Sequence, residues 1–82
     1  MSMVVSVEIS LYPLGEDSNN AIDVFIKLLS KSKLLTVEPG KMSTIITGEL
    51  SEIMETLSSS MEKVFEGGAA VFNLKISNCC PL

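Results

Sequence analysis

The chain has 82 residues, enough for one domain, and carries a net charge of −4 with six lysines, no arginine and no histidine. Surfaces that bind phosphate or nucleic acid need basic patches and arginine forks, so nucleic-acid binding is not expected. Without histidine the chain lacks the usual general base and the commonest metal ligand. We therefore predict no catalytic residues, no metal site and no cofactor.

Hydrophobic residues make up 46% of the chain, but a domain of this size buries only about 60–65% of its unfolded surface. Its core is therefore marginal, and association into a homodimer or homotetramer is expected to add stability. Glu8 and several serines interrupt the N-terminal stretch, unlike a signal peptide, and no apolar run approaches ~18 residues. The sequence thus predicts a cytoplasmic protein that does not enter a membrane.

The two cysteines, Cys79 and Cys80, are adjacent near the C-terminus. Adjacent cysteines form a disulfide bond only with strain, so they do not indicate a disulfide framework. The pair is typical of the strand end or tail of a reduced, intracellular protein. The alternative is a surface thiol site that binds a soft metal or is oxidised.

Met3–Tyr12 alternates between an apolar and a more polar side, with the period of two that is typical of a strand with one face in the core. Pro13 and Gly15 end this strand. From about Asn20 to Ser32, apolar residues recur at steps of three and four, which predicts an amphipathic helix. The apolar side of the strand is Val5, Val7, Ile9 and Leu11, and the helix stripe is Ile22, Phe25, Ile26 and Leu29.

Leu34–Glu38 is a short strand candidate, and after a turn Met42–Leu50 is rich in the β-branched residues that favour a strand. A second amphipathic helix follows, which we expect Ser51 to cap and Gly67-Gly68 to end. Ala69–Ser77 is the last strand, again with alternating sides. The chain therefore contains the order β-α-β-β-α-β.

This order predicts an α+β fold, the ferredoxin-like βαββαβ sandwich, in which a four-stranded antiparallel sheet carries two helices on one face. The right-handed crossover rule leaves the first and third strands in the centre of the sheet and the second and fourth at its edges. Residues 1–82 form this single domain, and residues 78–82 are expected to be a short flexible tail.

The sheet face away from the helices is expected to be solvated, covered by another subunit, or the floor of a ligand pocket. The first strand contributes Ser6, Glu8, Ser10 and Tyr12 to it. In the third strand Ile45 and Ile46 are both apolar, so the alternation is ambiguous. The outward set is either Ser43, Ile45, Thr47 and Glu49 or Met42, Thr44, Ile46 and Gly48.

Two segments are similar to the YkoF-like thiamine-binding proteins, and the resemblance spans nearly the whole chain. They are Tyr12-Pro13-Leu14-Gly15 and Met42-Ser43-Thr44-Ile45-Ile46-Thr47-Gly48-Glu49, and Lys75-Ile76 also fits. The resemblance implies a small cytosolic ferredoxin-like protein that binds thiamine or its hydroxymethylpyrimidine part without catalysis, in dimers that pair into tetramers. The chain departs from the family at Ser43, usually glycine, at Thr47, usually acidic, and in the tail, which usually contains acidic residues and arginine.

The implied ligand is a small cationic heteroaromatic molecule, which an acidic protein attracts weakly at long range. Serine and threonine hydroxyls both donate to and accept from a pyrimidine edge. Glu8 or Glu49 could pair with the cation, and Tyr12 or Phe72 could offer an aromatic face. The predicted ligand contacts are Ser10, Ser43, Thr44, Thr47 and Glu49, of which Thr44 and Glu49 rest on the matched motif. The alternative is an oligomeric regulatory or protein-interaction module without a thiamine site; an enzyme is not expected.

Overall fold

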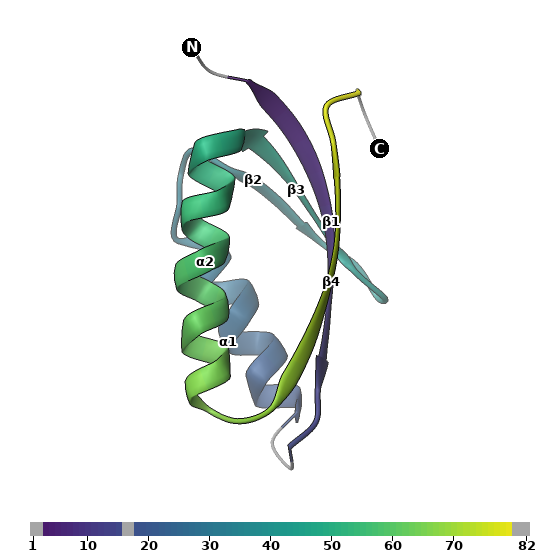
Figure 1. The fold of residues 1–82 in the computed structure, drawn as a ribbon, viewed down its shortest axis with the longest axis vertical. Coiled ribbons are helices and arrows are strands. Elements are labelled where there is room, and N and C mark those ends of the chain that lie inside the picture. The colour runs from purple at the N-terminus through teal and green to yellow at the C-terminus, as the bar shows by residue number, and fades with distance from the viewer. Residues whose placement is uncertain (1–2, 16–17, 80–82) are drawn as a thin grey trace.

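The computed structural model describes residues 3–15 and 18–79. The strands form one antiparallel sheet in the order β2-β3-β1-β4, and Figure 1 shows both helices against the same side of it. The predicted α+β, ferredoxin-like arrangement is therefore confirmed, with β1 and β3 central. The elements are β1 (Val4–Pro13), α1 (Ser18–Ser30), β2 (Thr36–Pro39), β3 (Thr44–Glu49), α2 (Leu50–Glu66) and β4 (Ala70–Ser77).

The core lies between the sheet and the helix pair. The alternation of β1 holds, because Val5, Val7 and Ile9 are buried beneath the helices while Tyr12 is exposed on the open face. Each large apolar side chain that is fully buried contributes about 1.5–3 kcal/mol. The buried set joins the sheet to both helices and comprises Val5, Val7, Ile9, Phe25, Leu29, Ile46, Ile53, Leu57 and Val64.

The pairing of β1 with β3 decides which side of β3 faces outward. Glu8 lies opposite Ile45 and Val7 lies opposite Ile46, and cross-strand partners share one face of a sheet. Ile46 is therefore in the core and Ile45 is on the open face. The outward set is Ser43, Ile45, Thr47 and Glu49, the first of the two alternatives that the sequence left open.

The start of α2 differs from the prediction. The helix begins at Leu50, so Ser51 lies inside it and does not cap it; Glu49 occupies the N-cap position and makes no side-chain cap hydrogen bond. The Leu50 N–H instead donates to the carbonyl of Met3 at 2.8 Å, while Ser51 Oγ donates to Glu49 Oε1 at 2.8 Å. The predicted Ser51 cap was wrong because the chain before β1 supplies an acceptor for the first turn.

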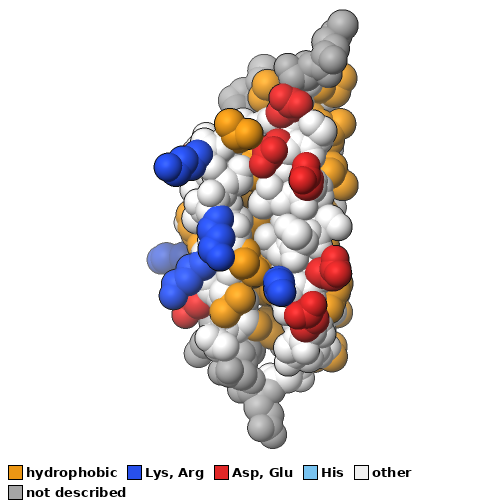
Figure 2. All heavy atoms as spheres, turned by 90° about the vertical axis from the view of Figure 1, so that its left-hand side faces the viewer, with side chains coloured by type: hydrophobic (Ala, Val, Ile, Leu, Met, Phe, Trp, Pro, Cys, Tyr) orange, Lys and Arg blue, Asp and Glu red, His pale blue; other side chains and the backbone are white. Residues whose placement is uncertain are grey.

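The outer surface of the helix layer is charged. Figure 2 shows lysines gathered over α1 and the segment after it, and acidic side chains over α2. Each of the two helices carries a lysine in its last turn, Lys27 in α1 and Lys63 in α2, where a cation complements the helix dipole. This solvated surface leaves the open sheet face and the sheet edges as the places to look for a ligand.

The chain beyond β4 is described only in part. Cys79 is exposed, and its N–H donates to Ser77 Oγ at 3.0 Å. The rest of the predicted tail, and with it Cys80, lies outside the described residues. Over residues 3–15 and 18–79, no helix has the length and apolar character needed to cross a membrane.

Candidate functional site

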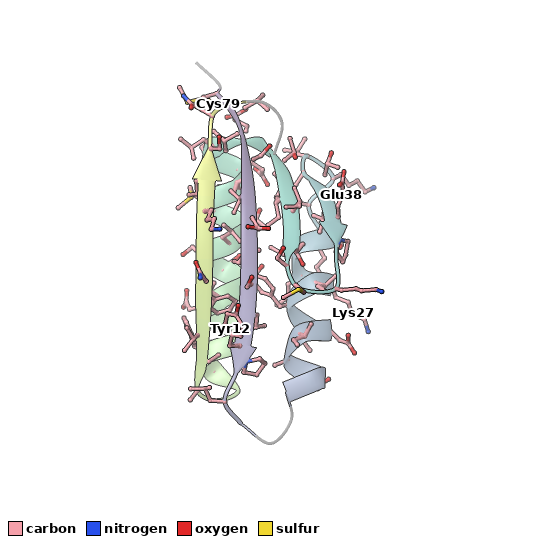
Figure 3. All side chains as sticks on the ribbon, turned by 90° about the vertical axis from the view of Figure 1, so that its right-hand side faces the viewer. Tyr12, Lys27, Glu38 and Cys79 are labelled. Atoms are coloured by element: carbon pink, nitrogen blue, oxygen red, sulfur yellow. The ribbon has the colours of Figure 1, made fainter. Side chains whose placement is uncertain are left out.

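One end of the sheet has a step, because β1 continues beyond β3. The β1–β3 ladder stops at Ile9 opposite Thr44, whereas β4 accompanies β1 as far as Pro13. Figure 3 shows β1 and β4 extending past the β2–β3 turn, and α1 passing behind that turn. A cavity of about 100 Å³ lies at this step, and we call it the step cavity. Its walls come from β1, the β2–β3 turn with the start of β3, and α1.

Three hydroxyl groups line the step cavity, and two of them are already engaged. Ser10 Oγ donates to the carbonyl of Met42 at 3.3 Å, and Ser43 Oγ donates to Glu8 Oε2 at 3.0 Å. Thr44 is only 7% exposed, and its hydroxyl makes no side-chain hydrogen bond within the described part of the chain. Thr44 therefore offers the available hydroxyl.

A peptide group of β1 also faces the step cavity. In a strand, the polar groups of successive residues point to alternate sides. The Leu14 N–H donates to Ala69 beside β4, while the carbonyl of Met3 accepts from Leu50 on the β3 side. The backbone N–H and C=O groups of the even-numbered residues of β1 therefore bond to β4. Those of the odd-numbered residues, including Leu11, point toward β3.

Leu11 lies one step beyond the last hydrogen-bonded pair of β1 and β3. The ladder register would next pair it with Met42, but the carbonyl of Met42 accepts from Ser10 Oγ instead. Across residues 3–15 and 18–79, the Leu11 N–H and C=O have no backbone partner. Leu11 thus presents one donor and one acceptor, side by side, to the step cavity that it lines.

The opposite wall of the step cavity is apolar and firmly held. Phe25 of α1 is 3% exposed, and its ring packs against Phe72 with centroids 5.0 Å apart. Phe72 in turn meets Phe65 edge-on at 5.3 Å. Such tilted and T-shaped pairs are favourable ring arrangements, so Phe25 is a rigid wall. Ile22 and Ile26 of the same helix continue it.

Glu8 provides charge beside the step cavity. Its carboxylate accepts from Ser43 at one oxygen and lies 3.8 Å from Lys75 Nζ at the other. The Glu8 side chain remains 38% exposed on the open face. It can therefore interact with a cation that projects out of the cavity over the sheet.

The structure brings together three of the five predicted contact residues: Ser10, Ser43 and Thr44 line the step cavity. Thr47 lies near the other end of the sheet, opposite Ser6, in a separate hollow of about 140 Å³. Glu49 ends β3, five residues beyond Thr44, which at ~3.3 Å per residue is about 17 Å away. One small ligand cannot touch all five residues.

No sequence pattern pointed to two parts of this site. Phe25 falls on the apolar stripe of α1, so its pattern is that of an ordinary core residue. The peptide group of Leu11 is available only because β3 begins at Thr44, two residues later than the expected strand start. Tyr12, labelled in Figure 3, lies on the open face opposite Val71, and Phe72 belongs to the ring cluster in the core.

Other hollows offer less to a ligand. One of about 390 Å³ between the helix ends and Gly15 is lined mainly by small and apolar residues. A groove of about 380 Å³ between α1 and α2 contains Glu52, whose Oε2 already accepts from Ser32 and Thr56. Within the described residues, no group of three or more histidine, cysteine or acidic side chains could hold a metal ion.

The chain is similar to proteins of a known family. The family described as "Thiamine-binding protein" matches residues 7–78, which confirms the resemblance seen in the sequence. No curated protein matches the chain.

Solved structures share the fold over most of their length. A putative thiamine biosynthesis/salvage protein from Thermotoga maritima is 27% identical with a TM-score of 0.81, over 90% of this chain and 82% of that one. A Streptococcus pneumoniae protein is 27% identical with a TM-score of 0.84, over 92% and 86%. A Bacillus cereus domain of unknown function, DUF77, is 25% identical with a TM-score of 0.80, over 94% and 77%.

Proposed function

This chain belongs to the thiamine-binding protein family, and from that premise we propose that it binds thiamine or its hydroxymethylpyrimidine part in the step cavity, without catalysing a reaction. We propose that it acts in the cytoplasm as a carrier, buffer or sensor. The observation that carries the proposal is the combination in one cavity of a rigid aromatic wall, an available hydroxyl and a peptide group without a backbone partner among the described residues. These groups suit a flat ring with polar edges.

The size of the cavity indicates which part of the ligand it holds. Pockets that enclose a drug-sized ligand measure roughly 300–1,000 Å³, whereas the step cavity measures about 100 Å³. It therefore accommodates a single ring, and the remainder of a larger ligand extends outside. We place the pyrimidine inside, against Phe25, and the cationic thiazolium of thiamine over the open face near Glu8.

Thr44→Val tests the cavity directly. Valine keeps the shape but removes the hydroxyl, so the affinity for hydroxymethylpyrimidine should fall about two- to tenfold, as expected for one hydrogen bond worth ~0.5–1.5 kcal/mol. The free energy of unfolding should not fall, since the hydroxyl has no side-chain partner in the described protein. Isothermal titration calorimetry and thermal unfolding measure the two effects.

Thr47→Val is the matched control for Thr44→Val, because it makes the same change in the other hollow. It should leave the affinity unchanged. An affinity that falls in Thr47→Val and not in Thr44→Val would move the site to the other end of the sheet. Absence of heat with thiamine and hydroxymethylpyrimidine at millimolar concentration would remove the proposed function.

Glu8→Gln separates the two parts of thiamine. Glutamine retains an oxygen that can accept from Ser43 but removes the negative charge. The affinity for cationic thiamine should fall about two- to fivefold, in the range of an exposed ion pair, and the affinity for neutral hydroxymethylpyrimidine should not change. Glu49→Gln, at the far end of β3, should change neither. If calorimetry shows that the affinity for thiamine falls in Glu49→Gln and not in Glu8→Gln, the carboxylate that pairs with the cation is that of Glu49.

We also propose that copies of the chain associate through β4, as a dimer or as part of a tetramer. This eight-residue edge strand exposes half of the Val71 side chain and nearly half of Ile76, on opposite faces. An exposed apolar edge is a template for pairing with another strand. Association at this edge without ligand binding would instead support the interaction-module alternative.

Val71→Lys should therefore reduce the solution mass toward that of the monomer, because it places a charge in the proposed contact. Light scattering at several protein concentrations measures this change. Thr36→Lys, on the same sheet face but at the β2 edge, is the control and should not alter the mass. Equal masses for the wild type and Val71→Lys would remove β4 as the contact.

A further inference from the structure

We infer that the main chain of Leu11 selects the ligand by the donor and acceptor order of its ring edge, so that the cavity accepts a 4-aminopyrimidine and rejects its 4-oxo counterpart. This inference rests on the proposed function, which places a pyrimidine in the step cavity. It adds the atoms that recognise the ring and the chemical class that they exclude.

The first step of the argument is the position of Leu11. One register relates the hydrogen-bonded pairs of β1 and β3, which are 3 with 50, 5 with 48, 7 with 46 and 9 with 44. The next pair in that register would be 11 with 42. Met42 leaves the ladder there, held through its carbonyl by Ser10 Oγ at 3.3 Å. The place that a strand residue would occupy beside Leu11 is the step cavity.

The second step is the chemistry of the vacant pair. A strand residue presents its N–H and C=O on the same side. Its partner on the next strand provides a C=O that accepts from this N–H and an N–H that donates to this C=O. The edge of a 4-aminopyrimidine has the same order, since the ring nitrogen accepts and the adjacent amino group donates. The Leu11 N–H would donate to the ring nitrogen, and its carbonyl would accept from the amino group.

The third step is the cost of a mismatch. A 4-oxo pyrimidine with its proton on the ring nitrogen reverses the order, so donor faces donor and acceptor faces acceptor. The surroundings compensate only in part, because Phe25 and Ile26 wall the cavity and the Ser10 and Ser43 hydroxyls already donate their protons. The Thr44 hydroxyl remains available, but one hydroxyl cannot satisfy both mismatched pairs. A buried polar group left without its partner is costly. Main-chain recognition also leaves no side-chain signature, which explains why the serine and threonine pattern alone did not reveal it.

Three neutral ligands test the inference on the intact protein: 4-amino-5-hydroxymethyl-2-methylpyrimidine, its 4-oxo analogue and the analogue with hydrogen at position 4. We expect the first to bind and the other two to bind about ten- to a hundredfold more weakly in calorimetry. Equal affinity for the amino and oxo compounds would overturn the inference while leaving the proposed function standing. Failure of all three and of thiamine to bind would remove the proposed function itself.

The peptide group can be tested by chemical synthesis of the 82-residue chain with an ester at Leu11, which replaces the N–H by oxygen and keeps the side chain. The affinity for the 4-amino compound should fall about tenfold, in the range for a lost hydrogen bond to a buried group. An ester at Leu74 is the control, since the N–H of that residue points away from β1 at the outer edge of β4. Thermal unfolding shows whether both chains fold.

A spectroscopic readout completes the test without altering the chain. In a ¹⁵N-labelled sample, the Leu11 amide proton should move downfield when the 4-amino ligand is added, and its exchange with solvent should slow. If Met42 closes onto Leu11 in solution, the amide is protected before any ligand is added and does not respond. That result, or an affinity unchanged by the Leu11 ester, would overturn the inference.

Discussion

Leu29→Ala should lower the free energy of unfolding by about 2–5 kcal/mol, the range for a leucine truncated in a packed core. Leu29 has no exposed surface and lies in the cluster that joins α1 to the sheet. A small domain has only about 5–15 kcal/mol of stability in total, so the variant loses a large share of it. Urea unfolding measures the loss.

Leu34→Ala makes the same chemical change on the surface and is the control for Leu29→Ala. Leu34 is 74% exposed, and substitutions of that kind usually fall within about 0.5 kcal/mol of the wild type. If both variants unfold at the same urea concentration, α1 does not cover the sheet as described.

Gly48→Ala should destabilise the protein by about 1–3 kcal/mol through overpacking. A Cβ at this position would lie 2.6 Å from Leu35 Cδ2 and 3.3 Å from the carbonyl oxygen of Leu34. The leucine side chain can move, but the backbone oxygen belongs to the connection before β2 and yields less. The cost is steric, since positive φ in the described residues is confined to Gly68.

Gly15→Ala is the matched control for Gly48→Ala, because a Cβ at Gly15 meets no atom within 4 Å. It should be neutral, or stabilising by several tenths of a kcal/mol through the lower entropy of the unfolded chain. Thermal unfolding of the two variants side by side measures the difference. A stable Gly48→Ala protein would show that the Leu34-Leu35 connection does not press on β3.

The fold was predictable because its signals are local and repeated. The period of two in β1 and the apolar stripe in α1 each persist over several residues, and once the element order is known the topology rules leave little choice. The start of α2 was less predictable. Its first N–H is satisfied by Met3, which is 47 positions earlier in the sequence, so no local cap was needed at Ser51.

The site was predictable only in part, and the reason is the geometry of the sheet. The hydroxyl-rich segment around Thr44 was visible in the sequence, and so was its similarity to thiamine-binding proteins. That segment is longer than a small ligand, so Thr47 and Glu49 lie too far along β3 from Ser10 to contact the same molecule. The step itself depends on where β3 begins relative to β1, which is a tertiary property, and Leu11 contributes through atoms that every residue has.

Because of Pro39, the two edge strands of the sheet, β2 and β4, differ in their ability to pair with an added strand. Ile45 and Thr47 pair through the backbone with Glu38 and Thr36, so the backbone N–H and C=O groups of the odd-numbered residues of β2 point away from the sheet. Pro39 is one of these residues and has no N–H, so this border lacks a donor there. The β4 border has a full row of donors on its outward even-numbered residues. Addition of a strand is therefore favoured at the β4 border over the β2 border, and the proposed contact at β4, if it is twofold, would end at a pair of chains.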